Sequence, residues 1–276
     1  METIQISSRV ENHYTKSKLF EEIVEKLRGQ GINITNLTRS DISAVDELHV
    51  GGAEASRALV SGLKIHNSAV IDVGCGLGGP SRMLADEFNC RVTGIDITPE
   101  FIRTARQLSD LVGLHERTEY LVGDALDLPF ENGYFDIAWT EHVQMNIENK
   151  SRFYGEISRV LRDGGLFIYY DIFRKGDGEL KYPLPWANDP SISFLTTTES
   201  VHEILTGLGL KKLQTTDFTS RGIDFFNEVF ENISQNGMPV LGLNLILGEQ
   251  TGLKMNNLMN ALQENVLELQ SGIYSK

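Results

Sequence analysis

The chain of 276 residues is poor in cysteine and has no long apolar run. Its two cysteines, Cys75 and Cys90, are too few for a disulfide framework or a cysteine-based metal site, so we predict no bound metal. No apolar run approaches the roughly 20 residues that a membrane helix needs. The first residues also lack the basic and then apolar layout of a signal peptide, which favours a cytoplasmic protein.

Positive charge is scarce, with 25 Lys and Arg against 38 Asp and Glu and a formal net charge of −13. Nucleic acid and anionic lipid both need a basic surface, so this balance argues against either partner. The hydrophobic content of 41% is ordinary for a globular protein, and the length suits one large α/β domain. We therefore expect a small-molecule partner. The oligomeric state stays open, with a homodimer among the options.

One stretch organises the sequence. A short apolar run over residues 70–73 is followed at once by a cluster of glycines, and a helix-like pattern begins at Pro80. The order of strand, tight turn and helix places backbone N–H groups and a helix N-terminus at the end of a strand. Asp72 adds a carboxylate at the ligand-facing end of that strand. We interpret the stretch as a cofactor site containing Gly74, Gly76, Gly78 and Gly79.

From residue 70 onward, apolar segments alternate with amphipathic ones. The predicted strands are 70–73, 91–96, 119–122, 134–139 and 166–170. This alternation predicts a parallel sheet with helices on both faces, and ligands of such sheets bind outside the carboxyl ends of the strands. We therefore expect convergence of the side chains that follow these strands, which are Asp72, Asp96, Asp124, Glu141 and His142.

The flanking segments predict additions to a single domain. Residues 1–65 form a helical cap with an amphipathic helix between residues 13 and 28, and residues 66–171 form the core. Residues 172–196 contain three prolines beside Trp186 and are too long for an ordinary connection, which predicts a cap over the substrate. Residues 197–276 add a helical insertion and the strands 210–216 and 267–274.

The glycine pattern alone fits two cofactors. Gly74, Gly76 and Gly79 match the dinucleotide fingerprint, with Asp96 at the place of a ribose-binding acid. An inward-facing Asp72 would repel the pyrophosphate of NAD but suits the cationic amino-acid tail of S-adenosylmethionine. Asp124 is then placed to accept the adenine amino group. We favour S-adenosylmethionine; an NAD-linked oxidoreductase and a non-catalytic binding protein stay open as alternatives.

Five blocks resemble, in order, the motifs of class I S-adenosylmethionine-dependent methyltransferases: residues 70–82, 94–98, 123–130, 135–139 and 159–166. The resemblance covers roughly residues 45–215. It implies a Rossmann-like seven-stranded sheet, mostly parallel with an antiparallel last strand, and methyl transfer to an amine, quinol, phenol or carboxylic acid.

Within that class the chain is similar to small-molecule enzymes of the ubiquinone/menaquinone C-methyltransferase, sarcosine/dimethylglycine N-methyltransferase and phosphoethanolamine N-methyltransferase types. The paired glycines after His49 resemble a segment of the phosphoethanolamine type. That type carries an Asp and a catalytic His where this chain has His142 and Asn146.

Three carboxylates at three consecutive strand ends are costly to bury unless they bind something. Together with the glycine turn they predict a cofactor site whose members are Asp72, Gly74, Cys75, Gly76, Gly78, Gly79, Asp96, Ile97, Gly123, Asp124, Ala125, Leu126 and Glu141.

Methyl transfer depends mainly on alignment, with a base where the acceptor arrives protonated. His142 is the first candidate base because it follows the fourth strand, and His49 is the second. Tyr14 is a third catalytic candidate, placed to cover the site. For each of them, a plain hydrogen-bonding or packing role is the alternative. The candidate substrate contacts are Trp139, Asn146 and Trp186.

Overall fold

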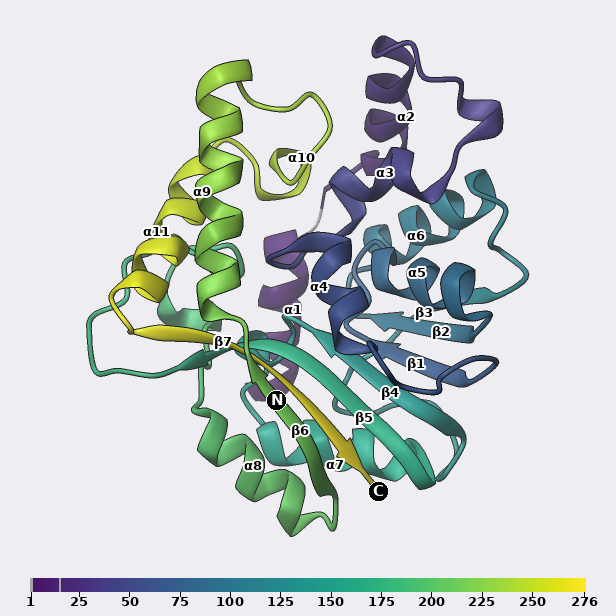
Figure 1. Ribbon diagram of the computed structural model, residues 1–276, viewed down its shortest axis with the longest axis vertical. Coiled ribbons are helices and arrows are strands. Elements are labelled where there is room, and N and C mark those ends of the chain that lie inside the picture. The colour runs from purple at the N-terminus through teal and green to yellow at the C-terminus, as the bar shows by residue number, and fades with distance from the viewer. Residues whose placement is uncertain (1, 15) are drawn as a thin grey trace.

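The strands of the computed structural model, which describes residues 2–14 and 16–276, lie in the order β3-β2-β1-β4-β5-β7-β6 (Figure 1). Strands β1 to β5 run parallel, and β7 pairs antiparallel with both β5 and β6. The expected antiparallel last strand is thus confirmed. The bounds are β1 Ala69–Val73, β2 Arg91–Asp96, β3 Thr118–Val122, β4 Phe135–Glu141, β5 Leu161–Arg174, β6 Lys211–Asp217 and β7 Leu267–Ser275.

Helices cover both faces of the sheet because successive strand residues point to opposite faces. On one face Val70 and Ile137 pack with α4 (Gly52–Leu59) and α5 (Gly79–Phe88), and α6 (Pro99–Leu111) lies against β2 and β3. On the other face Ile71 and Phe167 pack with α7 (Lys150–Val160) and α8 (Thr198–Gly207). The expected layered α/β architecture is therefore present.

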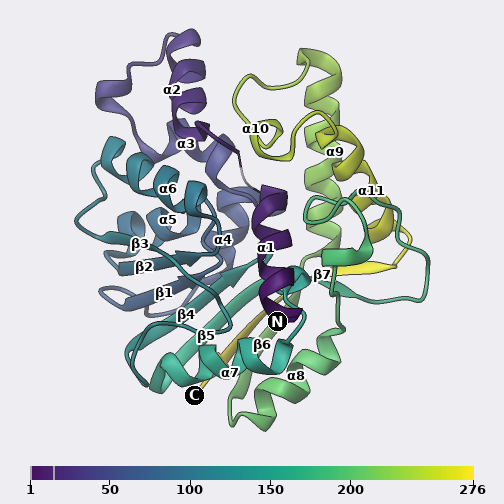
Figure 2. The same ribbon diagram turned by 180° about the vertical axis from the view of Figure 1, so that it is seen from behind.

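Two further groups of helices flank the region beyond the strand ends. One contains α2 (Leu19–Gly29) and α3 (Arg39–Asp46), and the other contains α9 (Thr219–Asn236), α10 (Asn244–Leu247) and α11 (Thr251–Gln263). Figure 2 shows α1 (Glu2–Tyr14) lying between the two groups, in front of the central strands. This arrangement encloses the carboxyl ends of β1 and β4, where the strand order reverses.

Three predicted boundaries were wrong. The single helix between residues 13 and 28 is two helices, because Lys18 takes a left-handed conformation with φ 64° and α2 starts at Leu19. Strand β5 continues to Arg174, since residues 171–174 pair with β7, so the insertion begins later than residue 172. Helix α9 has 18 residues, twice the length of the helix that the sequence predicts over residues 225–233.

No helix in the described part of the chain has the length and apolar character needed to cross a membrane. The cytoplasmic location and the homodimer stay predictions.

Candidate active site

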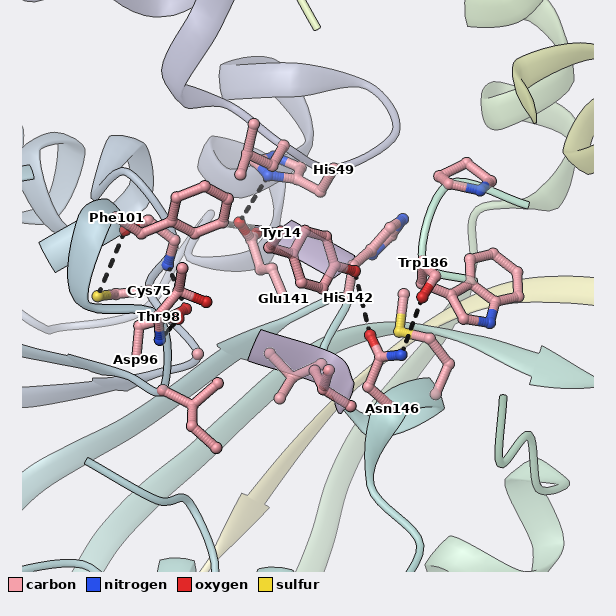
Figure 3. Close-up of a pocket in the computed structure, with 18 of the residues that line it drawn as sticks. Tyr14, His49, Cys75, Asp96, Thr98, Phe101, Glu141, His142, Asn146 and Trp186 are labelled. Atoms are coloured by element: carbon pink, nitrogen blue, oxygen red, sulfur yellow. Dashed lines mark hydrogen bonds and ion pairs between the residues drawn. The ribbon is translucent and has the colours of Figure 1, made fainter. Parts of the chain in front are cut away.

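A cavity lies at the carboxyl ends of the central strands (Figure 3). Its lining includes the side chains that were expected to converge, which are Asp72, Asp96, Asp124, Glu141 and His142. Strand register explains the meeting: Asp72 of β1 pairs with Gly94 of β2 and with Trp139 of β4, so the three strands end at nearly the same level. Their roles in binding stay predictions.

The glycine turn forms one wall of this cavity through Gly74, Cys75 and Gly76. Gly74 has φ 77°, and a Cβ there would lie 2.4 Å from Val143, so only glycine fits. The backbone N–H of Gly76 donates to Oδ2 of Asp96 at 3.0 Å, which ties the turn to the end of β2. The lining also includes the predicted Ile97, Gly123, Ala125 and Leu126.

Gly78 and Gly79 do not line the cavity, contrary to the expectation that they contact the cofactor. A Cβ on Gly78 would lie 2.5 Å from the hydroxyl of Tyr120, and one on Gly79 would lie 2.5 Å from the carbonyl oxygen of Asp46. Both glycines are therefore needed for close packing at the start of α5.

Two carboxyl groups stand on either side of the turn. Asp96 accepts the N–H of Gly76 with one oxygen and the N–H of Thr98 with the other, at 3.0 and 2.8 Å. Asp72 is buried and accepts the hydroxyl of Ser81 at 2.6 Å. Burial raises the pKa of Asp72 to about 7, because loss of water outweighs the hydrogen bond from Ser81. A cation placed in the cavity would favour the ionised form.

His49 and Glu141 form a buried pair. Nδ1 of His49 lies 3.2 Å from Oε2 of Glu141, and the hydroxyl of Ser56 donates to that oxygen at 3.0 Å. Nε2 of His49 is 2.9 Å from the carbonyl oxygen of Gly52, which assigns its proton to Nε2 and leaves Nδ1 as an acceptor.

Burial sets the protonation of this pair. It lowers the pKa of His49 to about 4 and raises the pKa of Glu141 well above its usual range, with Glu47 and Asp72 adding to that rise. The carboxyl group of Glu141 is therefore protonated and His49 is neutral. The carboxyl proton is shared between Oε2 of Glu141 and Nδ1 of His49. The indole N–H of Trp139 faces the carboxyl group of Glu141 and lowers its pKa, which opposes the effect of burial in part.

His142 does not have the geometry of a general base. Its Nδ1 lies 3.3 Å from the carbonyl oxygen of Tyr170 and its Nε2 accepts the N–H of Val50 at 3.3 Å, so both ring nitrogens are engaged. Burial, together with the neighbouring His49, lowers the pKa of His142 to about 3. The prediction of His142 as the first candidate base is corrected to a residue that joins the loop around Val50 to β5.

Tyr14 and Asn146 meet across the cavity. The hydroxyl of Tyr14 donates to Oδ1 of Asn146 at 3.1 Å, and Nδ2 of Asn146 donates to the carbonyl oxygens of Trp186 and Ile192 at 3.0 and 2.9 Å. Burial and the nearby Asp96 raise the pKa of Tyr14, so it stays a neutral phenol. These three predicted residues, Tyr14, Asn146 and Trp186, all line the cavity.

Trp139 does not reach the cavity. It lies in the middle of β4, is fully buried and packs in the core beneath the site, so the expectation of a substrate contact was wrong.

The sequence did not predict the apolar wall of the cavity that α9, the segment around α10, and α11 form. The only signal was helical periodicity, which does not say which cavity a helix covers.

Comparison with known proteins agrees with the geometry. Residues 71–169 match a family described as a methyltransferase domain. Tocopherol O-methyltransferase from Arabidopsis thaliana is 39% identical over 99 residues, which cover 36% of this chain and 28% of that protein. Sarcosine/dimethylglycine N-methyltransferase from Halorhodospira halochloris is 28% identical over 153 residues, 55% of each protein.

Among solved structures, geranyl diphosphate C-methyltransferase from Streptomyces coelicolor A3(2) superposes with a TM-score of 0.69. The match covers 98% of this chain and 97% of that one at 14% identity, so it shows the class I methyltransferase fold alone. The chain spans only 28–37% of the length of the first three curated relatives.

Proposed function

We propose that this chain, which carries a methyltransferase domain, transfers a methyl group from S-adenosylmethionine to a small molecule. The observation that carries the proposal is the charge of the cavity. Its described lining contains the carboxyl groups of Asp72, Asp96, Asp124 and Glu141 around a glycine turn, and it contains no Lys or Arg.

That lining fits a cofactor with a cationic sulfonium and an ammonium group, and it does not fit a pyrophosphate, which these carboxylates would repel. S-adenosylmethionine, when bound, supplies a methyl group activated by positive charge. Asp96 has lone pairs left after its two backbone hydrogen bonds and would accept ribose hydroxyls. Asp72 and Glu141, which both line the cavity, would face the cationic groups.

The protein's own contribution is alignment and proton handling. Tyr14, Asn146 and Trp186 order α1 and the insertion over the site, which excludes water from it. Where the acceptor carries a proton, Glu141 would receive it after losing the proton that it shares with His49, and a bound cation would favour that loss by lowering the pKa of Glu141.

Calorimetric titration with S-adenosylhomocysteine and with NADH tests the proposal. Binding of S-adenosylhomocysteine is expected, and binding of NADH alone would overturn it. Asp96→Asn should weaken S-adenosylhomocysteine by about tenfold or more, because a charge-assisted hydrogen bond is worth roughly 1.5–3 kcal/mol. The matched control is Asp163→Asn at an exposed position. Absence of methyl transfer to a panel of amines, quinols and carboxylic acids, despite binding, would favour a non-catalytic protein.

A further inference from the structure

The part of the cavity away from the strand ends, which we call the acceptor half, has walls from four segments. Helix α1 contributes Val10, α9 contributes Phe225 and Phe226, the segment around α10 contributes Leu243, and α11 contributes Met255. Figure 3 shows Tyr14 and His142 between Asp96 on one side and Trp186 on the other. The walls are therefore made by segments outside the core that matches the methyltransferase domain.

Polar groups at the boundary of the acceptor half are already occupied. Asn146 uses its carbonyl oxygen for Tyr14 and its amide nitrogen for two backbone carbonyls. The indole N–H of Trp186 donates to Ser193 at 3.0 Å. Both nitrogens of His142 are engaged as well. An acceptor molecule therefore meets few free donors in this half.

Positive charge is also missing from the described lining. It contains no Lys or Arg, and the two histidines, His49 and His142, stay neutral because burial lowers the pKa of each. The buried Lys254 on α11 is close by in sequence to Met255, but its ammonium group donates to the carbonyl oxygen of Leu247 at 3.3 Å and it is not part of the lining. A phosphate or carboxylate group would find no countercharge there.

We infer that the methyl acceptor is an uncharged, bulky and largely apolar molecule with a single O–H or N–H group, and that it carries no phosphate or carboxylate. The inference rests on the proposed function. Burial of the acceptor's apolar surface supplies the affinity. The single polar group of the acceptor would lie toward the strand ends, where His49 and Glu141 line the cavity.

The test compares geraniol with geranyl diphosphate, which share one apolar chain and differ in charge. Binding to the full chain is followed by tryptophan fluorescence with S-adenosylhomocysteine present and absent. We expect geraniol to bind at least tenfold more tightly than geranyl diphosphate. Equal or tighter binding of the diphosphate would overturn the inference.

A charge variant sharpens the comparison. Leu243→Lys places a cation in the half-buried wall and should reduce the preference for geraniol severalfold, while Leu213→Lys at an exposed site on β6 should leave it unchanged. An unchanged preference in Leu243→Lys would count against the inference, and if that variant does not fold, the wild-type comparison still decides. Failure of S-adenosylhomocysteine to bind in the same titrations would instead count against the proposed function.

Discussion

The hydroxyl of Tyr14 lies 3.1 Å from Oδ1 of Asn146, although the two residues are 132 positions apart. The preceding residue makes a parallel contact, since Nε2 of His13 is 3.2 Å from the carbonyl oxygen of Pro185. Two hydrogen bonds therefore join the end of α1 to the loop after β4 and to the insertion. These two bonds hold α1, which forms one wall of the acceptor half, against the rest of the site.

Tyr14→Phe keeps the ring and removes the bond to Asn146. The net contribution of such a hydrogen bond is about 0.5–1.5 kcal/mol. We expect acceptor binding to weaken about two- to tenfold, measured as KM or by fluorescence titration, with the affinity for S-adenosylhomocysteine changed less. The control is Tyr134→Phe, because Tyr134 is 61% exposed. Equal acceptor affinity in the two variants would show that α1 does not close the site through this bond.

Asp72→Asn should raise the stability of the folded protein at alkaline pH and weaken its binding of S-adenosylmethionine. The pKa of Asp72 in the folded protein, about 7, lies above its ordinary value near 4, so its stabilising contribution is complete below about pH 4 and is lost as the pH rises through 7. At pH 8 the ionised group should cost roughly 1–4 kcal/mol, whereas Asn keeps the hydrogen bond from Ser81 at no such cost.

Urea unfolding without ligand should therefore show Asp72→Asn to be more stable than the wild type at pH 8, with the difference shrinking toward pH 5. The same variant should bind S-adenosylmethionine at least tenfold more weakly. A variant that is no more stable at pH 8 would mean that the carboxyl is not held in a poorly solvated place. Asp163→Asn at an exposed position should change neither quantity.

The cofactor side of the site could be predicted because it depends on local order. Asp72, Gly74 and Asp96 follow strands that alternation alone predicts, and parallel strands bring their carboxyl ends to one edge. The role of a single side chain could not be predicted in this way. Trp139 lies on β4 and His142 follows it directly. The contacts of His142 with Val50 and Tyr170 decide its role, and Trp139 is fixed by its packing in the core. These partners are distant in sequence, so the local pattern does not predict the contacts.

The lining of the acceptor half could not be predicted from the sequence for the same reason. Phe225, Leu243 and Met255 belong to helices whose apolar faces are visible, but periodicity does not say whether such a face packs on the sheet or on a cavity. Ser56 was missed because a serine in a short helix carries no signal until Glu141 is seen 3.0 Å away.

The buried ion pair of Arg82 and Asp46 anchors the loop that carries His49. Nη2 of Arg82 lies 2.5 Å from Oδ2 of Asp46, and both side chains are fully buried. Arg82→Met leaves Asp46 as an uncompensated charge, so we expect a loss of about 3–5 kcal/mol in the free energy of urea unfolding. Adding Asp46→Asn should recover part of that loss. Arg91→Met, at an exposed position, should lose little. A small loss in Arg82→Met would mean that Asp46 is not charged in the folded protein.

Binding of a cation should displace the proton shared by Glu141 and His49. Because burial holds the pKa of Glu141 high, a cation bound beside it should lower that pKa and release the proton at neutral pH. S-adenosylmethionine and S-adenosylhomocysteine differ in the sulfonium charge. Calorimetry in buffers of different ionisation enthalpy should therefore show more protons released on binding S-adenosylmethionine than on binding S-adenosylhomocysteine.

Two variants identify the titrating group. Glu141→Gln should abolish the difference between the two ligands, because an amide has no proton to lose. His142→Asn should keep it, since His142 is already neutral with a pKa of about 3 and Asn tolerates the left-handed conformation at this position, where φ is 53°. If the difference persists in Glu141→Gln and vanishes in His142→Asn, the titrating group is His142, and His142 is then available as a base.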